Sequence, residues 1–534
     1  MRRGRTGWGP VVELEFAANL VWVAVVAVLL SLLLRSRGIS TAIPLLIAGA
    51  GLGLLPVGPN APAEPEAIQA LILAPLVFGE ALSSSYIDLK RVRRPVLGLA
   101  IGLVAVTTLV VGGVVASVAG AMPLAMAFAI GAVLAPTDAV AVAAAARRAN
   151  LPQRLVSILE GESLVNDGTG LTALRVATVA AVAGSVTVGQ AGLILLQSVV
   201  VAIIVGGLAG WILVTVIRRS TDVVGIGGLL LIAPFGLYIV TERLGGSSIL
   251  AIVIASLMAS HASASDPSYR GRLHTAAVWR QITFILQSIA FLLLGLELPD
   301  AIAKLSESDR ALLLVLVPTV VITLIVTRLA FVVGAFGLDR LRRTPATHSL
   351  RSALVVGWAG ARGPVSALAA FSIPLLTATG EALPYRDLVI AVSLTSIAVM
   401  LALSLTLSPL ATRLKVEQPP SAELSARIEA ALARAALGAL EDAENDADRA
   451  GHPLAPEVVR SLRRSAEHRL DSIREGQAPE DDLRVKVRGL GVAMAQAEQQ
   501  ELLRLRTEEG LPDTAVRAKM VELDRRISTL RSSS

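Results

Sequence analysis

The sequence contains no cysteine, which excludes disulfide bonds and thiolate metal sites. Its five histidines are scattered along the chain, which argues against a zinc centre. Charged residues make up only 17% of the 534 residues, whereas soluble domains contain roughly 25%. The alternating polar faces of a soluble fold are also missing from most of the chain. The low share of charged residues and the missing polar faces favour a protein that lies within a membrane.

Apolar runs of bilayer length follow one another up to about residue 415. Hydrophobic residues make up 54% of the chain, and the mean hydropathy is +0.68. Because a span needs ~20 mostly apolar residues, these runs predict an all-α polytopic membrane protein with about 13 transmembrane helices. The predicted spans are 14–35, 40–56, 67–85, 95–119, 122–146, 152–181, 188–217, 222–241, 247–263, 275–296, 310–337, 350–377 and 385–412.

Basic residues are concentrated in the loops that follow the odd-numbered spans. Such residues mark the cytoplasmic side, so we predict a cytoplasmic C-terminal tail and an N-terminus outside. Arg2, Arg3 and Arg5 point the other way for the N-terminus. The net charge of +6 is therefore a signal of topology and not of nucleic-acid binding. The loops carry Arg35 and Arg37, then Lys90 to Arg94, then Arg147, Arg148 and Arg154, then Arg218 and Arg219, then Arg270 and Arg272, then Arg340 to Arg351.

The composition changes after about Val416, where Glu, Asp, Arg and Ala dominate. We therefore predict a membrane domain at residues 1–415 and a soluble helical cytoplasmic tail at residues 416–534. Within the tail, the stretches Ala422–Ala443 and Leu483–Thr507 are typical of helices. A tail without chemistry, a regulatory tail and a tail that contributes to dimer contacts all fit this composition.

Two of the predicted spans contain residues that break helices. One break is Leu134–Asp138, which contains a proline, and the other is Gly357–Pro364. Transporters often place discontinuous helices at matching positions of two inverted repeats, with the ion site between them. A break at membrane depth frees backbone carbonyls, which are tolerated where they line a cavity. We therefore predict inverted repeats with two broken helices that cross.

Several ionisable side chains fall inside the predicted spans. Each costs ~2.5–3.5 kcal/mol at the bilayer centre, so together they would cost more than roughly 15 kcal/mol if unpaired. A marginally stable fold cannot carry that cost, so these groups must pair, bind an ion or take up protons. They are Glu80, Asp138, Glu160, Glu162, Asp167, Arg328 and Arg362.

The sixth predicted span carries the richest polar pattern. On a helix, Glu162 and Asn166 lie four residues apart, as do Ser163 and Asp167, so all four share one face. Their carboxylate, hydroxyl and amide oxygens are hard ligands that suit Na⁺ or Li⁺. A polar seam that closes a helix bundle would give the same spacing.

The balance of charge suggests an exchange mechanism. Four acids (Glu80, Asp138, Glu162 and Asp167) face two arginines. If each arginine neutralises one acid, two carboxylates remain, and either a metal cation or a proton can neutralise one of them. Competition between Na⁺ and H⁺ for the same carboxylate is sufficient for exchange if the empty, charged site cannot cross the membrane.

At these residues the sequence resembles the bacterial NhaP-type sodium/proton antiporters, which are relatives of the animal sodium/proton exchangers. The resemblance extends over about residues 11–415. The matching segments are Thr137–Val142, Gly161–Gly168, Phe291–Leu298, Thr327–Arg328 and Gly360–Gly363.

The resemblance implies a homodimeric secondary transporter of the bacterial inner membrane that acts in pH homeostasis, and not an enzyme. It implies that Asp167 carries the cation and the proton in turn. Ser163, Glu80, the backbone carbonyl of Thr137 and Asp138 would help to ligate Na⁺. The expected ligands are the transported Na⁺ or Li⁺ and H⁺, with no cofactor.

Asn166 resembles the electroneutral branch of the family, because electrogenic relatives carry two adjacent aspartates at this place. In the electroneutral branch, the glutamate at Glu162 pairs with the arginine at Arg328. We expect Arg362 to compensate the C-terminal dipoles of the broken helices.

The near alternative is a transporter of another cation, whereas a channel and a protease fit the sequence less well. A potassium/proton antiporter would share nearly every motif. A channel would need a selectivity filter, which we do not find. An intramembrane aspartyl protease would need Asp138 and Asp167 to share a proton, and Arg328 would have no part in it.

Overall fold

The computed structural model describes residues 10–55, 69–138, 142, 146, 151–184, 187–220, 222–264, 269–341, 350–416 and 421–449, with isolated positions beyond. Contacts between residues divide the chain into two compact units, Met1–Glu417 and Gln418–Ser534.

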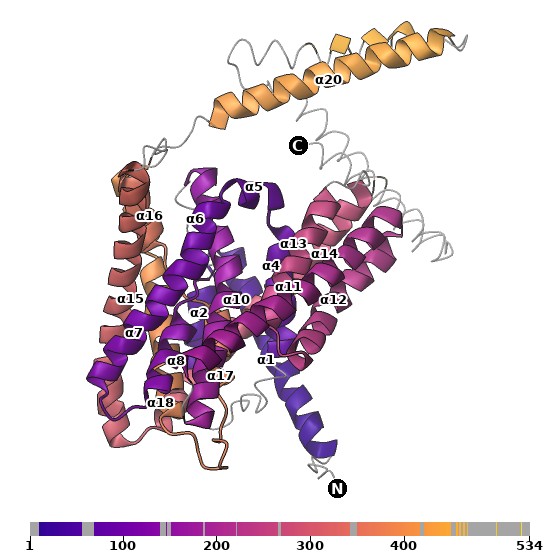
Figure 1. Ribbon diagram of the computed structural model, residues 1–534. Coiled ribbons are helices and arrows are strands. Elements are labelled where there is room, and N and C mark those ends of the chain that lie inside the picture. Colours follow the sequence, from indigo (N-terminus) through magenta and orange to yellow (C-terminus); the bar gives the residue numbers. More distant parts are fainter. Residues whose placement is uncertain are drawn as a thin grey trace. The chain divides into compact units, whose positions relative to one another are not determined.

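Most described residues of the first unit lie in helices, of which η1 and η2 are short π-helical turns (Figure 1). The elements are α1 (Pro10–Ser36), α2 (Ala42–Gly53), η1 (Gln69–Leu73), α4 (Ala74–Ser83), α5 (Tyr86–Arg91), α6 (Arg93–Leu97), η2 (Gly98–Leu103), α7 (Val104–Val118), α8 (Leu124–Leu134), α10 (Gln153–Ala183), α11 (Val188–Arg219), α12 (Val223–Arg243), α13 (Ser248–Ala264), α14 (Tyr269–Ala303), α15 (Glu307–Leu341), α16 (Leu350–Trp358), α17 (Pro364–Phe371), α18 (Arg386–Ser404) and α19 (Leu407–Leu414).

Seven helical stretches within the described residues are long and apolar enough to cross a membrane. The predicted class, an all-helical polytopic membrane protein, is confirmed, whereas the count of about 13 spans stays a prediction. Four shorter apolar helices accompany the seven, and these are Ala42–Gly53, Gln69–Ser83, Leu124–Leu134 and Ser248–Ser263.

Some helices extend well beyond the predicted spans. The tenth span was expected at 275–296, but α14 runs from Tyr269 to Ala303. The eleventh was expected at 310–337, but α15 runs from Glu307 to Leu341. The apolar run marks only the part that suits lipid, and the backbone hydrogen bonds of a helix continue into the polar residues on either side.

Several helices present large apolar side chains on the surface of the first unit. On α11, Leu196, Ile204 and Leu208 are 61%, 62% and 58% exposed. In a soluble monomer such a continuous apolar surface would be unusual. Contact with lipid tails explains it, since lipid imposes no penalty on exposed leucine or isoleucine.

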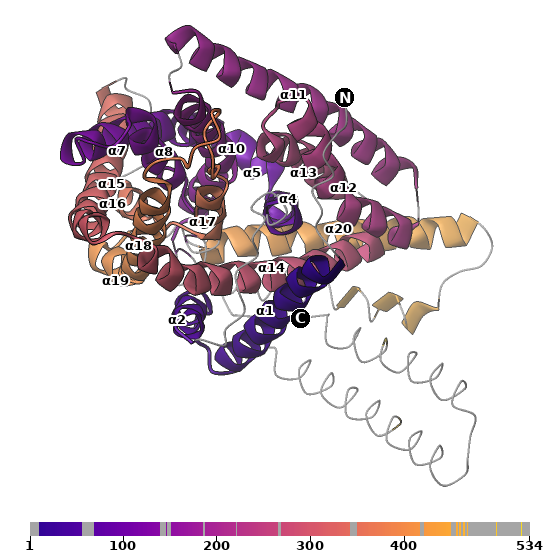
Figure 2. The ribbon, with the colours of Figure 1, turned by 90° about the horizontal axis from the view of Figure 1, so that it is seen from below.

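Helix α14 joins several parts of the first unit. It packs against α1 and α2 on one side and also contacts α4, α17 and α18 (Figure 2). Helix α10 contacts α8, α13 and η2, whereas α15 contacts α7, α16 and α18. Helices far apart in the sequence therefore meet around α10 and α14.

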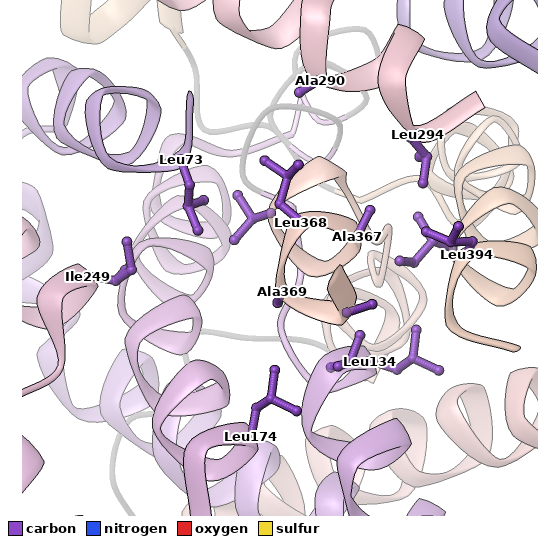
Figure 3. Close-up of a cluster of buried hydrophobic side chains, with 14 of the residues drawn as sticks. Leu73, Leu134, Leu174, Ile249, Ala290, Leu294, Ala367, Leu368, Ala369 and Leu394 are labelled. Atoms are coloured by element: carbon purple, nitrogen blue, oxygen red, sulfur yellow. The ribbon is translucent and has the colours of Figure 1, made fainter. Parts of the chain in front are cut away.

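The short helix α17 lies inside the apolar core. Its residues Ala367, Leu368 and Ala369 are 1–3% exposed. Figure 3 shows them surrounded by side chains from other helices, among them Leu134 of α8 and Leu394 of α18. This packing holds the second half of a broken helix in place, although the helix is not continuous with α16.

The second unit contains α20 (Ser421–Arg449), which covers the helix predicted at Ala422–Ala443. Glu444 of α20 forms an ion pair with Arg463. The other predicted helix of the tail, Leu483–Thr507, lies outside the described residues.

Candidate functional site

The first break begins where α8 ends at Leu134. The next residues leave the helical path at Pro136, whose ring cannot continue the hydrogen-bond ladder. Thr137 and Asp138 follow in non-helical backbone and are 2% and 6% exposed. The break therefore delivers two polar side chains into the interior of the helix bundle.

The second break separates α16 from α17 and meets the first. The backbone N–H of Asp138 donates to the carbonyl of Ala361 over 2.9 Å. A Cβ atom at Gly363 would lie 2.5 Å from the Cβ and 2.6 Å from Oδ2 of Asp138, so glycine is required at this approach. The two broken helices thus touch at their non-helical segments.

Helix α10 contributes four buried polar side chains to the same region. Glu162, Ser163 and Asn166 are each 1% exposed, and Asp167 is 5% exposed. The face predicted from the helical spacing is present in the structure, and it packs against the first break.

The hydroxyl group of Thr137 connects the first break to α10. It lies 3.0 Å from the Ser163 hydroxyl and accepts a hydrogen bond of 2.8 Å from Nδ2 of Asn166. It also lies 3.4 Å from Oε1 of Glu162 and can donate to it. The sequence suggested a role for the backbone carbonyl of Thr137, and it gave no sign that the hydroxyl is the centre of this network.

Asn166 presents its second polar atom without a partner. Its Oδ1 atom is buried and has no hydrogen bond to the described residues. A buried amide oxygen left in this state costs about 1–3 kcal/mol. An incoming donor or cation would remove that cost.

Glu162 and Arg328 form a buried ion pair between α10 and α15. Both carboxylate oxygens are engaged, Oε1 by Nη1 and Oε2 by Nη2 at 2.8 Å. Nη2 also donates to the carbonyl of Val356 in α16, over 3.3 Å. The pair is bidentate, which is the strongest geometry for arginine and a carboxylate. Glu162 is therefore neutralised inside the protein.

Arg362 is 2% exposed and directs its guanidinium group at backbone carbonyls. Its Nε donates to the carbonyl of Leu134, at the C-terminal end of α8. Its Nη1 donates to the carbonyl of Gly360 over 2.7 Å, just after the end of α16. A positive charge at two helix C-termini offsets their dipoles. These hydrogen bonds go to carbonyls, whereas the charge balance drawn from the sequence assumed that each arginine would neutralise a carboxylate.

Asp167 is the acid of α10 that Arg328 does not neutralise. Its carboxylate has no hydrogen bond or ion pair with any residue in the described ranges. The charges of Glu80 and Asp138 both act on it, which places the three acids within electrostatic range of one another. Repulsion between three carboxylates favours the uptake of a cation or a proton.

Glu80 reaches this region from α4, and it is less buried than Asp167. Its side chain is partly exposed, and Oε1 lies 3.5 Å from Nε2 of Gln287 on α14. Gln287 was not predicted from the sequence, because a neutral amide does not stand out in a search for charged residues within apolar runs.

Two other charged residues of the sixth predicted span lie elsewhere. Arg175 donates to the carbonyl of Gly246 over 3.0 Å and lies 3.8 Å from Glu242, near the start of α13. Glu160 is partly exposed, on the part of α10 before the site. In the described part of the chain, no group of three His, Cys, Asp or Glu side chains is close enough to hold a metal ion by itself.

The chain is similar in sequence to known sodium/hydrogen exchangers over most of its length. The model of the sodium/hydrogen exchanger transmembrane family matches residues 22–413. An uncharacterised Na⁺/H⁺ exchanger of Mycobacterium tuberculosis is 31% identical, over 96% of this chain and 96% of the relative. A sodium, potassium, lithium and rubidium/H⁺ antiporter of Bacillus pumilus is 33% identical, over 79% of this chain and 66% of the relative.

The fold also matches a solved structure. The sodium proton antiporter MjNhaP1 from Methanocaldococcus jannaschii aligns with a TM-score of 0.61 and 20% identity. The alignment covers 76% of this chain and all of the solved chain. From the family match over most of its length and from its similarity to these relatives, the chain belongs to the sodium/hydrogen exchanger family.

Proposed function

We propose that this protein exchanges Na⁺ or Li⁺ for H⁺, and that the cation and the proton compete for the carboxylate of Asp167. The observation that carries this proposal is the difference between the two buried acids of α10. Glu162 is neutralised by Arg328, whereas Asp167 has no such partner among the described residues. A buried carboxylate that is not paired must bind a cation or a proton.

The surroundings of Asp167 suit a small, hard cation. Ser163, Thr137 and Asn166 offer hydroxyl and amide oxygens, and Glu80 and Asp138 add negative charge. Oxygen ligands of this kind favour alkali and alkaline-earth cations over softer metals. The binding site in this proposal consists of Asp167 and these five residues.

Exchange follows if Asp167 crosses the membrane only when it is neutralised. One face of the membrane supplies Na⁺ to the carboxylate, and the other supplies H⁺ after Na⁺ has left. Glu162 keeps its arginine throughout, and Arg362 keeps its two carbonyls, so neither takes part in the exchange of charge. One carboxylate that alternates between Na⁺ and H⁺ moves no net charge in a full cycle.

We infer that the exchange is electroneutral, because position 166 holds an asparagine and not a second acid. A membrane potential imposed with a permeant anion should leave the rate unchanged. A rate that follows the membrane potential would instead require a second transported charge.

Potassium is the second candidate cation. The Bacillus pumilus relative is named for sodium, potassium, lithium and rubidium. The same set of oxygen ligands would accept K⁺ if the site were wider. A KCl pulse that releases the pH gradient when NaCl and LiCl pulses do not would identify K⁺ as the transported cation.

We further propose that the protein is a homodimer in the bacterial inner membrane, where it acts in pH homeostasis with its tail in the cytoplasm. Basic residues in the last turns of α5 and α11, such as Arg91 and Arg218, support this orientation. Cysteine labelling from either side would test it, since the natural chain has no cysteine.

The transport proposal is tested in proteoliposomes that contain a pH-sensitive dye. Pulses of NaCl, LiCl or KCl should release a preformed pH gradient with the wild-type protein and not with Asp167→Asn. Asp300→Asn, which alters an exposed acid at the end of α14, is the matched control and should behave like wild type. Proton flux that no cation elicits at any pH, or full activity of Asp167→Asn, would refute the proposal.

A further inference from the structure

Gln287 lies in the middle of an apolar stretch of α14, at the contact between α14 and α4. Its neighbours in sequence include Ile285, Leu286 and Ile289. A glutamine here gains nothing from apolar packing and must find a polar partner. The partner that the structure provides is Glu80, with Nε2 of Gln287 3.5 Å from Oε1 of the carboxylate.

The side chains of α14 that face α4 form a stripe. Trp279, Thr283 and Gln287 recur at intervals of four residues and therefore lie along one face. A Cβ atom at Gly79 would lie 2.7 Å from the Thr283 hydroxyl and 2.8 Å from the Trp279 ring, so α4 can approach this stripe only with glycine at position 79. The ring of Trp279 also packs on Phe78, with centroids 5.1 Å apart.

This close contact fixes the position of Glu80 relative to Gln287. Because Gly79 is pressed against the stripe, the next residue along α4 has little freedom to move away from α14. The neighbouring polar residue on α14 serves a different contact, since the Ser288 hydroxyl accepts from Ser31 of α1 over 2.9 Å. Gln287 is thus the residue of α14 that contacts the Glu80 carboxylate.

The chemistry of an amide is suited to this task. A lysine or arginine at position 287 would also hold the carboxylate, but it would neutralise Glu80 and remove its attraction for a cation. An amide N–H donates a hydrogen bond and adds no net charge. The amide of Gln287 therefore restrains the Glu80 carboxylate without adding a charge that would neutralise it.

We propose that Gln287 is a positioning residue that holds the Glu80 carboxylate on the α4 side of the cation site and thereby contributes to cation selectivity. The inference rests on the proposed function, because it assigns a role within the same site. Restrained ligands discriminate between ions by size, and a smaller cation needs shorter and better-defined distances to its oxygens. Loss of the restraint on Glu80 should therefore weaken the binding of small cations more than the binding of large ones.

The test compares Gln287→Met with wild type in proteoliposomes, with Li⁺, Na⁺ and K⁺ each titrated. Methionine keeps the length of the side chain and removes the hydrogen bond. We expect the concentration of Na⁺ for the half-maximal rate to rise about 10-fold, as for the loss of a hydrogen bond to a charged group. The rise should be larger for Li⁺ than for Na⁺, and larger for Na⁺ than for K⁺.

Gln69→Met is the matched control, because Gln69 also uses its amide in a contact between helices, a hydrogen bond with Tyr238 of 3.1 Å. It should change neither the order of the apparent affinities for Li⁺, Na⁺ and K⁺ nor the ratios between them. Gln287→Ala is measured as well, so that a folding defect specific to methionine does not decide the result.

Equal weakening of every transported cation, or cation affinities like those of wild type in both Gln287 variants, would overturn the role assigned to Gln287. A change of selectivity in Gln69→Met would overturn it too. In each of these cases the wild-type protein still exchanges cations, so the proposed function stands. Absence of exchange in wild type would overturn the proposed function, and this inference with it.

Discussion

The ion pair between Glu162 and Arg328 provides a quantitative test of how the site is built. The two side chains are 1% and 2% exposed, and both carboxylate oxygens are bound to the guanidinium group. Removal of one partner leaves a buried charge without compensation, which costs about 3–5 kcal/mol. We therefore expect Arg328→Met to lower the free energy of unfolding by that amount.

Removal of both partners should cost much less than the sum of the two single changes. Replacement of a buried ion pair by uncharged groups of similar volume is often close to neutral. The double variant Glu162→Gln with Arg328→Met should therefore recover most of the stability lost by Arg328→Met alone. The two changes should show a coupling energy of at least about 2 kcal/mol, since residues in direct contact are not additive.

An exposed ion pair of the same protein serves as the control. Lys304 and Asp300 approach to 2.6 Å, but their side chains are 58% and 55% exposed. Such a pair at i and i+4 contributes only about 0.3–0.5 kcal/mol. The hydrogen bond to Asp300 raises the pKa of Lys304, so this contribution is complete at neutral pH and is lost as the pH rises through the raised pKa. Lys304→Met should therefore have little effect on stability at pH 7.

Equilibrium unfolding in mixed micelles, followed by tryptophan fluorescence, measures all four variants. The reasoning would be refuted if Arg328→Met cost less than about 1 kcal/mol, or if the double variant were as unstable as the sum of its single changes. Either result would mean that Glu162 finds another way to lose its charge when Arg328 is absent.

Three further substitutions test other contacts of the site. Gly363→Ala should lower the free energy of unfolding by about 1–3 kcal/mol and abolish transport, because its Cβ would overlap Asp138. The control is Gly207→Ala, whose Cβ would enter open space and which should leave stability unchanged in a thermal unfolding assay. Thr137→Val keeps the shape of the side chain and removes the hydroxyl group that contacts three other side chains. The transport rate should therefore fall at least about 10-fold, and Thr137→Ser should restore it. The contacts of Arg175 lie outside the site, so Arg175→Gln should change the apparent cation affinity by no more than about 2-fold in the dye assay. A larger loss of affinity would mean that Arg175 acts on the site.

Much of the site could be predicted from the sequence, because buried charge and broken helices are both expensive. Pro136 and the glycines around Arg362 predicted the two breaks. The helical spacing of polar residues predicted the polar face of α10. The pairing of Glu162 with Arg328 followed from the resemblance to a family. The structure adds that the breaks meet through the backbone, at Asp138 and Ala361.

Other features could not be predicted, because they depend on where helices distant in sequence come together. The hydroxyl of Thr137 became central only once its break packed against α10. Gln287 is half-buried and carries no charge, so it gives no strong signal in a sequence. Arg175 lies only two helical turns beyond Asp167, yet its side chain reaches the carbonyl of Gly246 and not the acid. The direction of a side chain relative to other helices is set by tertiary packing.

The central claim is that Na⁺ and H⁺ compete for the carboxylate of Asp167. Calorimetric titration of the purified protein with Na⁺, in two buffers that differ in their heat of ionisation, counts the protons released for each cation bound. The account predicts that wild type releases about one proton per Na⁺ at a pH where the empty site is protonated, and that Asp167→Asn releases none. Binding of Na⁺ without release of a proton, or an unchanged release from Asp167→Asn, would contradict it.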